Sequence, residues 1–508
     1  MIRIIDCGSQ LTQNIARRVR EMGVFTEIVP FNTKSREILT AGLEGLVISG
    51  GQFSVYDSDA PKYDPAILDS NVPVLGICYG QQSIAHFCGG RVEQAKNREY
   101  GRTKIIIASD SPLFKGINES TFDVWMSHGD IVRNLPPGFN EVAISDNGHA
   151  AAMQHLQRGI YAVQFHPEVD HTSYGRRILD NFLTICSAQR TWNPENDYDS
   201  IVDDVRARLS GKVGVGGISG GVDSTVASIL IASVVGKDFH PIFVDNGLLR
   251  LNEAEEVRES LEPFGMNVHY VDASERFLNK LKRVTDPDEK RRIIGHEFIA
   301  VFEEEARKIA GAEYLVQGTL YPDVIESVPV FGSSSKIKRH HNVGGLPEKL
   351  GLKIYEPFRN MFKDEVRRIA ERKLGLSRYI VWRHPFPGPG LAVRIKGEVN
   401  AEKLKILREA DHVFISELKK LGAYYDISQA FAVLTNDQSV GVMGDEGNYD
   451  GVIALRAVTT NDFMTSDIYH FKWEDLQAIT NRIINEVRGV NRVVYDTSQK
   501  PPATIEWE

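Results

Sequence analysis

The chain of 508 residues has few cysteines, no long apolar run and no excess of positive charge. Its four cysteines form no CxxC pair and are too sparse to cross-link a chain of this length, which argues against a disulfide framework and a thiolate zinc site. No run approaches the ~20 apolar residues of a membrane span, and the first residues lack a basic segment followed by an apolar one. We therefore expect a cytoplasmic protein with reduced thiols and no membrane partner.

The charge balance argues against nucleic acid as a main partner. Lys and Arg number 59 against 68 Asp and Glu, a net charge of −9, so non-specific attraction to polyanions is weak. Charged residues at 25% and hydrophobic residues at 42% are ordinary for globular proteins, which excludes fibrous and wholly disordered classes. The charge balance therefore favours small molecules or proteins as partners. At about 150 residues per domain, the length predicts two to four domains.

Three different modules are predicted along the chain, at residues 1–190, 191–382 and 383–508. In the first two, short β-branched runs alternate with helical stretches, which predicts parallel α/β sheets. The polar stretch 191–199 contains a proline and predicts a linker, and the proline- and glycine-rich string RHPFPGPG at 383–390 predicts the second boundary. The last module has a long amphipathic helix followed by strand patterns, so we expect an α+β domain.

Cys78 lies where an apolar strand meets a helix, in VPVLGICYGQQ (72–82). Such a turn is a nucleophile elbow that raises the thiol above the sheet, and the following helix N-terminus favours the thiolate. His166 ends another predicted strand, and Glu168 follows it, so a base and its orienting carboxylate are available. The stretch Ser49-Gly50-Gly51 leaves room for backbone donors to an oxyanion. Taken singly, a buried structural cysteine and a surface His-Pro-Glu turn are the alternative interpretations.

The strings GICYG, SGGQ, WMSHGD and VQFHPE resemble the class I glutamine amidotransferase family. The resemblance implies that Cys78, His166 and Glu168 are the nucleophile, base and orienting carboxylate of glutamine hydrolysis, which yields glutamate and ammonia. The glutamine and oxyanion contacts of the family fall on Gly51, Tyr79 and Gln82. Two positions depart from the family pattern, because Gln52 and Gln81 stand where proline and methionine are usual.

A second site is predicted where the strand 212–218 is followed at once by a glycine- and hydroxyl-rich loop and a helix. Glycines, hydroxyls and a helix N-terminus together make an anion cradle. No lysine follows in the Walker A position, which excludes that motif, and Asp223 could hold Mg²⁺ against phosphates. On its glycines alone, the loop is equally typical of a plain strand-to-helix turn. Its residues are Ser219, Gly220, Gly221, Val222, Asp223, Ser224 and Thr225.

The string SGGVDS resembles the pyrophosphate loop of the ATP pyrophosphatase family, whose members adenylylate a substrate oxygen and release pyrophosphate. The resemblance implies ATP as co-substrate with Mg²⁺, and Lys363 matches a family lysine on the pyrophosphate. The string VDNG at 244–247 ends the next strand, where nucleotides gather in open α/β sheets. Two adjacent histidines in HHNVGG (340–345) lack a further metal-ligand set, so we expect a lid there.

The order of the modules, with RHPFPGPGLAVR, HHNVGGLPE, DFMTSD and KPPATIEWE, resembles the glutamine-hydrolysing GMP synthetase family over the whole chain. The resemblance implies that xanthosine 5′-phosphate (XMP) is adenylylated at its C2 oxygen and aminated to GMP. It also implies a flavodoxin-like amidotransferase domain, a Rossmann-like ATP pyrophosphatase domain and a smaller α+β domain that makes a homodimer. The XMP contacts fall on Arg291, Asp445, Lys500 and Glu506. Gly447 stands where relatives typically carry arginine.

Two other functions remain open from the residues. An NAD synthetase-like or tRNA-modifying pyrophosphatase would share the phosphate loop, although a tRNA enzyme predicts basic patches and additional thiols that this composition lacks. A nucleotide-binding regulator with decayed catalytic sites would bind ATP or XMP without turnover. Turnover with each substrate pair separates these functions.

Overall fold

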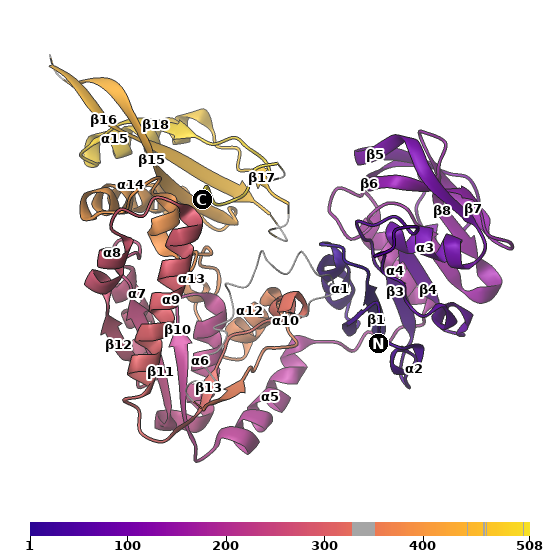
Figure 1. Cartoon of the computed structure of the whole chain (residues 1–508), viewed down its shortest axis with the longest axis horizontal. Helices are drawn as coiled ribbons and strands as arrows, with labels where there is room; N and C mark the ends of the chain where they lie inside the picture. The colour runs from indigo at the N-terminus through magenta and orange to yellow at the C-terminus, as the bar shows by residue number, and fades with distance from the viewer. Residues whose placement is uncertain (328–350, 444–445, 461–462, 464, 501) are drawn as a thin grey trace. The chain divides into compact units, whose positions relative to one another are not determined.

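The computed structural model describes residues 1–327, 351–443, 446–460, 463, 465–500 and 502–508 (Figure 1). The expected lid string at 340–345 and the expected XMP contact Asp445 lie outside the described residues. The chain forms two compact units, one of Met1–Asn193 and one of Pro194–Val324 with the described residues from 351 onward.

The first unit contains a nine-stranded sheet in the order β2-β1-β3-β4-β9-β8-β7-β5-β6. The strands from β2 to β9 in this order are parallel neighbours, and those from β9 to β6 are antiparallel. The strand bounds are β1 Ile2–Asp6, β2 Thr26–Pro30, β3 Gly45–Ile48, β4 Val74–Ile77, β5 Arg91–Ile107, β6 Thr121–Asn134, β7 Asn140–Ser145, β8 Ala150–His155 and β9 Ile160–Val163.

Burial explains why only half of this sheet was expected from the sequence. Every residue of β1, β3, β4 and β9 is buried, so these strands are continuous apolar runs, as parallel strands covered on both faces are. The 17-residue strand β5 has only four buried positions and carries many charges, which hides it from a search for apolar runs. The helices of this unit are α1 Thr12–Glu21, α2 Ser35–Ile38, α3 Tyr79–Phe87 and α4 Gly175–Ile185.

The second unit begins with a five-stranded parallel sheet in the order β12-β11-β10-β13-β14. Its strands are β10 Val213–Ile218, β11 Phe239–Asp245, β12 His269–Asp272, β13 Ala312–Val316 and β14 Lys353–Tyr355. The accompanying helices are α5 Pro194–Leu209, α6 Val222–Val235, α7 Glu253–Leu261, α8 Ser274–Leu281, α9 Pro287–Ala306, α10 Tyr321–Ser327, α12 Lys363–Arg372 and α13 Arg378–Val381. This parallel sheet confirms the expected Rossmann-like α/β class.

The linker predicted at 191–199 is wrong in its second half, because α5 already begins at Pro194. Proline suits the first helical position, where its fixed φ fits and its missing N–H has no partner to lose. Glu195 and Asp197 lie in the first turn, where negative charge is favourable. Polar composition alone therefore indicated a loop where helix-start signals were present.

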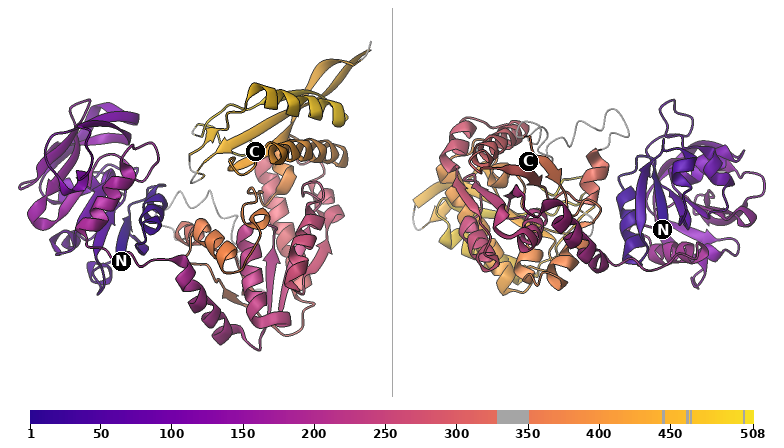
Figure 2. Two further views of the ribbon diagram at one scale, coloured as in Figure 1. Left: turned by 180° about the vertical axis from the view of Figure 1, so that it is seen from behind. Right: turned by 90° about the horizontal axis from the view of Figure 1, so that it is seen from below.

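A smaller mixed sheet completes the second unit. The expected long amphipathic helix, α14, belongs to the same part of the chain. Its strands are β15 Gln429–Met443, β16 Glu446–Thr459, β17 Asp467–Ile468 and β18 Val490–Tyr495, with helices α14 Ala401–Lys420 and α15 Trp473–Glu486. β15 and β16 form a long hairpin that extends past the shorter strands (Figure 2).

One hydrophobic cluster joins the two sheets of the second unit. It contains Val215 and Ile242 from the parallel sheet, Phe414 from α14 and Leu455 from β16. These two sheets therefore share a core, and the division at 382/383 stays a prediction. Within the described part of the chain, no helix combines the length and apolarity that crossing a membrane requires.

Candidate functional site

Cys78 occupies a sharp turn between β4 and α3. Its φ of 53° lies in the left-handed region, which is unusual for a residue other than glycine. Glycines on both sides allow this turn: a Cβ on Gly80 would lie 2.3 Å from the carbonyl oxygen of Ile48, and one on Gly76 would lie 2.5 Å from Cδ1 of Ile84. The turn places the Cys78 thiol at the N-terminus of α3, where a thiolate is favoured.

His166 and Glu168 lie beside this thiol and form a buried pair. His166 Nδ1 is 2.7 Å from Glu168 Oε1, and the two side chains are 5% and 0% exposed. Burial lowers the pKa of His166, but the charge of Glu168 and the interaction with Cys78 outweigh burial and raise the pKa well above its usual value. The raised pKa favours the protonated imidazolium form of His166 beside Cys78.

The glycine loop after β3 completes the surroundings of the thiol. A Cβ on Gly50 would lie 3.2 Å from His166 Cε1 and 3.5 Å from Cys78 Cβ, so the bare backbone of this loop packs against both groups. Gly51 is equally close-packed, because its Cβ would lie 2.6 Å from the carbonyl oxygen of Cys7. Tyr79 is the first residue of α3, where backbone N–H groups have no partner within the helix.

Gln82 and Gln81, in the first turn of α3, donate hydrogen bonds to β6 and β8. Gln82 Nε2 donates to the carbonyl oxygen of Asp130 at 2.9 Å and to Gln164 Oε1 at 3.3 Å. Gln81, one of the positions that depart from the family pattern, is fully buried and donates to the carbonyl oxygen of Ala150 at 2.9 Å. Both glutamines therefore have structural partners, and the glutamine-binding role of Gln82 stays a prediction.

The expected phosphate loop connects β10 to α6, as the sequence predicts. Ser219 and Ser224 fix its shape, with the two Oγ atoms 3.1 Å apart and the Ser219 N–H donating to Ser224 Oγ at 3.2 Å. Gly220 has a φ of +73°. Backbone N–H groups at the start of α6 face an anion placed over the loop.

Lys363 reaches this loop from the start of α12, 140 residues later in the chain. Its Nζ lies 3.0 Å from Asp223 Oδ2, and the other carboxylate oxygen, Oδ1, is buried without a hydrogen-bond partner. The structure thus brings together two residues that the sequence assigned to one site. Among the described residues, no group of three or more His, Cys, Asp or Glu side chains is arranged to hold a metal ion.

Two family models match parts of the chain, and full-length relatives match all of it. The family model "Glutamine amidotransferase class-I" matches residues 3–186, and "GMP synthase C terminal domain" matches 416–507. The chain is 53% identical to "GMP synthase [glutamine-hydrolyzing]" of Carboxydothermus hydrogenoformans, covering 99% of each chain. It is 51% identical to the proteins of that name from Aquifex aeolicus and Saccharomyces cerevisiae, covering all of this chain and 99% and 98% of theirs. The chain belongs to the glutamine-hydrolysing GMP synthase family.

Three of the four residues expected to contact XMP in a GMP synthase lie in the described part of the chain and have partners within it. Arg291 on α9 contacts the backbone oxygen of Glu508, and Lys500 Nζ donates to the carbonyl oxygen of Phe463 at 2.7 Å. Glu506 accepts from the fully buried Arg394 at 2.8 Å. The C-terminal segment is therefore packed against α9 and the residues before α14, and the XMP roles stay predictions.

Sequence reasoning missed a buried contact between Glu99 and His128, which lie opposite each other on β5 and β6. His128 Nε2 is 2.8 Å from Glu99 Oε2, and Ser145 and Asn147 donate to Glu99 Oε1 at 2.7 and 2.8 Å. Burial raises the pKa of Glu99, but hydrogen bonds from His128 and these two residues lower it to about 2.

The Glu99–His128 contact lies next to the strand residues that face the nucleophile. His128 Nδ1 is 3.0 Å from the carbonyl oxygen of Asp130, which also accepts from Gln82. The carbonyl oxygen of the preceding residue, Ser127, accepts a hydrogen bond from the Cys78 thiol at 3.7 Å. The string WMSHGD was a signal for His128, whereas nothing in the charged stretch around Glu99 indicated its burial.

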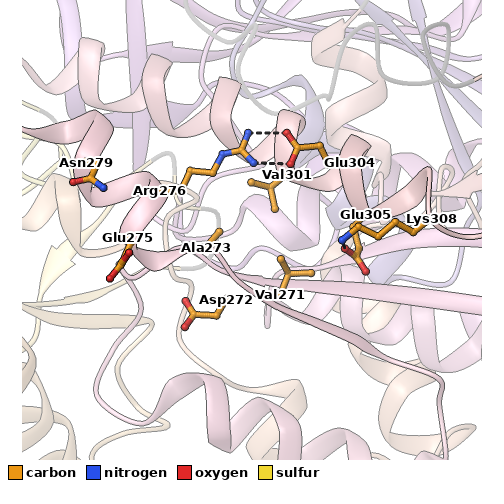
Figure 3. Close-up of a pocket in the computed structure, with 10 residues that line it drawn as sticks. All are labelled: Val271, Asp272, Ala273, Glu275, Arg276, Asn279, Val301, Glu304, Glu305 and Lys308. Atoms are coloured by element: carbon orange, nitrogen blue, oxygen red, sulfur yellow. Dashed lines mark hydrogen bonds and ion pairs between the residues drawn. The ribbon is translucent and has the colours of Figure 1, made fainter.

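A cavity of about 540 Å³ lies beside β12, α8 and α9 of this GMP synthase family member (Figure 3). Arg276 forms a two-point ion pair with Glu304, and Lys308 pairs with Glu305. Its cationic side chains thus already have carboxylate partners in the wall of the cavity, and it contains none of the residues predicted from the sequence.

Gly80→Ala tests the steric basis of the elbow. We expect the new Cβ to push α3 away from β3, lower the stability by about 1–3 kcal/mol, and reduce glutamine-driven activity at least about 10-fold because Cys78 moves. Calorimetry and a glutaminase assay measure both effects. Gly295→Ala is the control, because its Cβ meets open space on α9; equal effects of the two changes would contradict the steric account.

Glu99→Gln tests the contribution of the buried Glu99 carboxylate. Because the folded-state pKa of about 2 lies below the usual 4.5, the carboxylate stabilises the fold above pH 4.5 and loses this contribution as the pH falls toward 2. We expect the variant to be less stable by on the order of 2–3 kcal/mol at pH 7. Calorimetry of both full chains should show this difference shrinking below pH 4.5.

The control for this change is Glu93→Gln on the same strand, where the carboxylate pairs with Arg133 at the surface. An exposed pair contributes at most about 1 kcal/mol, so the control should show little change. A stability difference for Glu99→Gln that is independent of pH between 5 and 3 would rule out the ionised carboxylate as its cause.

Proposed function

We propose that the chain makes GMP from XMP, with ammonia supplied by glutamine hydrolysis at Cys78. The observation that supports this most directly is the strained Cys78 elbow beside the buried His166–Glu168 pair, in a chain that glutamine-hydrolysing GMP synthases match from end to end. Thiolates attack carbonyl carbon well, and an adjacent imidazolium is a ready proton donor.

In the proposed glutaminase reaction, the Cys78 thiolate attacks the amide carbon of glutamine. The backbone N–H groups of Gly51 and Tyr79 stabilise the oxyanion. The imidazolium of His166 gives its proton to the departing nitrogen, which leaves as ammonia, and the neutral ring then takes a proton from water as the water attacks the thioester. Glutamate and the free thiolate result, and Glu168 keeps His166 oriented throughout.

In the proposed activation step, the phosphate loop binds the β- and γ-phosphates of ATP while the C2 oxygen of XMP attacks the α-phosphorus. Pyrophosphate leaves, and ammonia then displaces AMP to give GMP. Lys363 supplies positive charge to the departing pyrophosphate. Mg²⁺ would neutralise the phosphates further, and the buried, unpaired Oδ1 of Asp223 fits a single carboxylate ligand of a phosphate-bound ion.

The proposal includes the XMP contacts, the domains and the assembly. Arg291 suits a phosphate because its guanidinium can bind it at two points. Domains at 1–190, 191–382 and 383–508 would supply ammonia, ATP chemistry and XMP contacts in turn, in a cytoplasmic homodimer. Exposed apolar side chains on β15 and β16 support a protein interface in the last domain: Val440, Val442 and Tyr449 are 62%, 78% and 69% exposed.

Product stoichiometry with and without the thiol tests the function. Wild-type protein with XMP, ATP, Mg²⁺ and glutamine should yield GMP, AMP, pyrophosphate and glutamate in equal amounts. Cys78→Ala should abolish the glutamine-driven reaction and leave the ammonium-driven reaction within about 2-fold, because the phosphate loop is untouched. Chromatography of the four products measures both.

Cys88→Ala is the matched control, since Cys88 follows the same helix but is only partly buried. Glutamine-driven GMP formation by Cys78→Ala would show that another group is the nucleophile. Formation of neither GMP nor AMP by the wild type from either nitrogen source would favour the regulator.

The proposed dimer is tested by sedimentation velocity. Wild type should sediment as a dimer of the 56.8 kDa chain, and Val442→Lys should shift it toward monomer because a charge on an apolar interface is desolvated. Val494→Lys on β18, where the side chain is 43% exposed, is the control. A monomeric wild type would refute the assembly and leave the chemistry standing.

A further inference from the structure

Arg383 approaches the phosphate loop from a part of the chain 163 residues away. Its Nη1 donates to the carbonyl oxygen of Gly220 at 3.3 Å, and its Nη2 donates to Glu253 Oε1. A Cβ on Gly220 would lie 3.2 Å from Nη1, so the glycine leaves room for the guanidinium. The side chains of Arg383 and Glu253 are only 13% and 3% exposed, so this contact is built into the fold.

Glu253 is itself fixed where α7 begins. Its Oε2 accepts from the backbone N–H of Arg250 at 2.8 Å, and Arg250 Nε lies 3.1 Å from the buried carboxylate of Asp411. The Arg383 guanidinium therefore spans a fixed carboxylate and a carbonyl of the loop. Arginine is suited to this, because it stays charged and presents its donors in a planar fork.

His384, the residue after Arg383, connects this segment to the C-terminal sheet through hydrogen bonds. Burial lowers the pKa of His384 to about 4, so the ring is neutral at pH 7. Its Nδ1 then accepts from the Ala430 N–H at 3.2 Å, and its Nε2–H donates to the carbonyl oxygen of Tyr424 at 2.7 Å. The ring also stacks on Tyr424, with centroids 3.9 Å apart. The position of Arg383 is thus set by Tyr424, which lies between α14 and β15, and by β15 itself.

We propose that Arg383 is a positioning residue for adenylylation, which holds the phosphate loop through the Gly220 carbonyl in the shape that binds ATP. Gly220 has a left-handed backbone conformation, and the loop turns toward α6 at this residue. A hydrogen bond that holds the Gly220 carbonyl therefore also orients the backbone N–H groups of the residues that follow. The inference rests on the proposed function of this loop. It links the loop to the region that contains the proposed XMP contacts, without direct contact between Arg383 and substrate.

The test is ATP–pyrophosphate exchange, measured with XMP and Mg²⁺, on full-length Arg383→Gln and Arg383→Lys. For Arg383→Gln we expect the KM for ATP to rise about 10-fold or more and the KM for XMP to stay within about 2-fold. Arg383→Lys should recover little of this loss, because one ammonium keeps the charge but lacks the fork that bridges the two acceptors. Glu253→Gln should shift the KM for ATP in the same direction by less.

The control is Arg372→Gln, which removes a surface arginine paired with Glu195 and should change neither KM by more than about 2-fold. An unchanged KM for ATP in Arg383→Gln overturns the inference. So does a parallel loss of ATP binding, XMP binding and melting temperature, because that pattern describes a general structural brace. Absence of exchange by the wild type refutes the proposed function of the loop, and the inference with it, which separates the two failures.

Discussion

Both candidate sites depend on one constraint, the direction of neighbouring strands in a parallel sheet. Parallel strands require crossover connections, so each strand that leads into a helix places that helix N-terminus at the same edge of the sheet. In the first unit β4 leads into α3 and places Cys78 at this edge, and in the second β10 leads into α6 and places the phosphate loop there. One topological rule thus supplies a thiolate site and an anion site, and the residues at each turn decide which chemistry is available.

The sequence predicted the position of the candidate sites where the reactive residues lie in turns that themselves require small residues. Cys78 between two glycines and the SGGVDS loop were predicted because the turns themselves need small residues, and the long helix α14 was predicted from its apolar period. The antiparallel part of the first sheet was not predicted, because strands exposed on one face and rich in charge resemble loops. Pro194 was taken as a loop signal although it starts α5.

Contacts between distant residues could not be predicted from the sequence where no motif places both residues in one site. Glu99 meets His128 only because the register of β5 against β6 sets them opposite each other. Arg383 meets Gly220 only after two sheets have packed on a common core. A charged residue in a polar stretch is usually solvated, and its sequence neighbours give no sign that folding will bury it beside a distant partner. The triad and the loop lie near such pairs, so their geometry depends on residues that no local pattern marks.

The burial of Cys78 has a consequence for covalent inhibitors. The residue is only 3% exposed, whereas Cys88 at the other end of α3 is partly accessible. Alkylating reagents react with the thiolates that they can reach, and burial raises the pKa of the Cys88 thiol, so the outer thiol is accessible but a weaker nucleophile. Selective labelling of the inner thiol requires a molecule whose shape and polar groups carry it past the glycine loop before it reacts. Selectivity for Cys78 therefore depends on access to the buried thiol as well as on thiol reactivity.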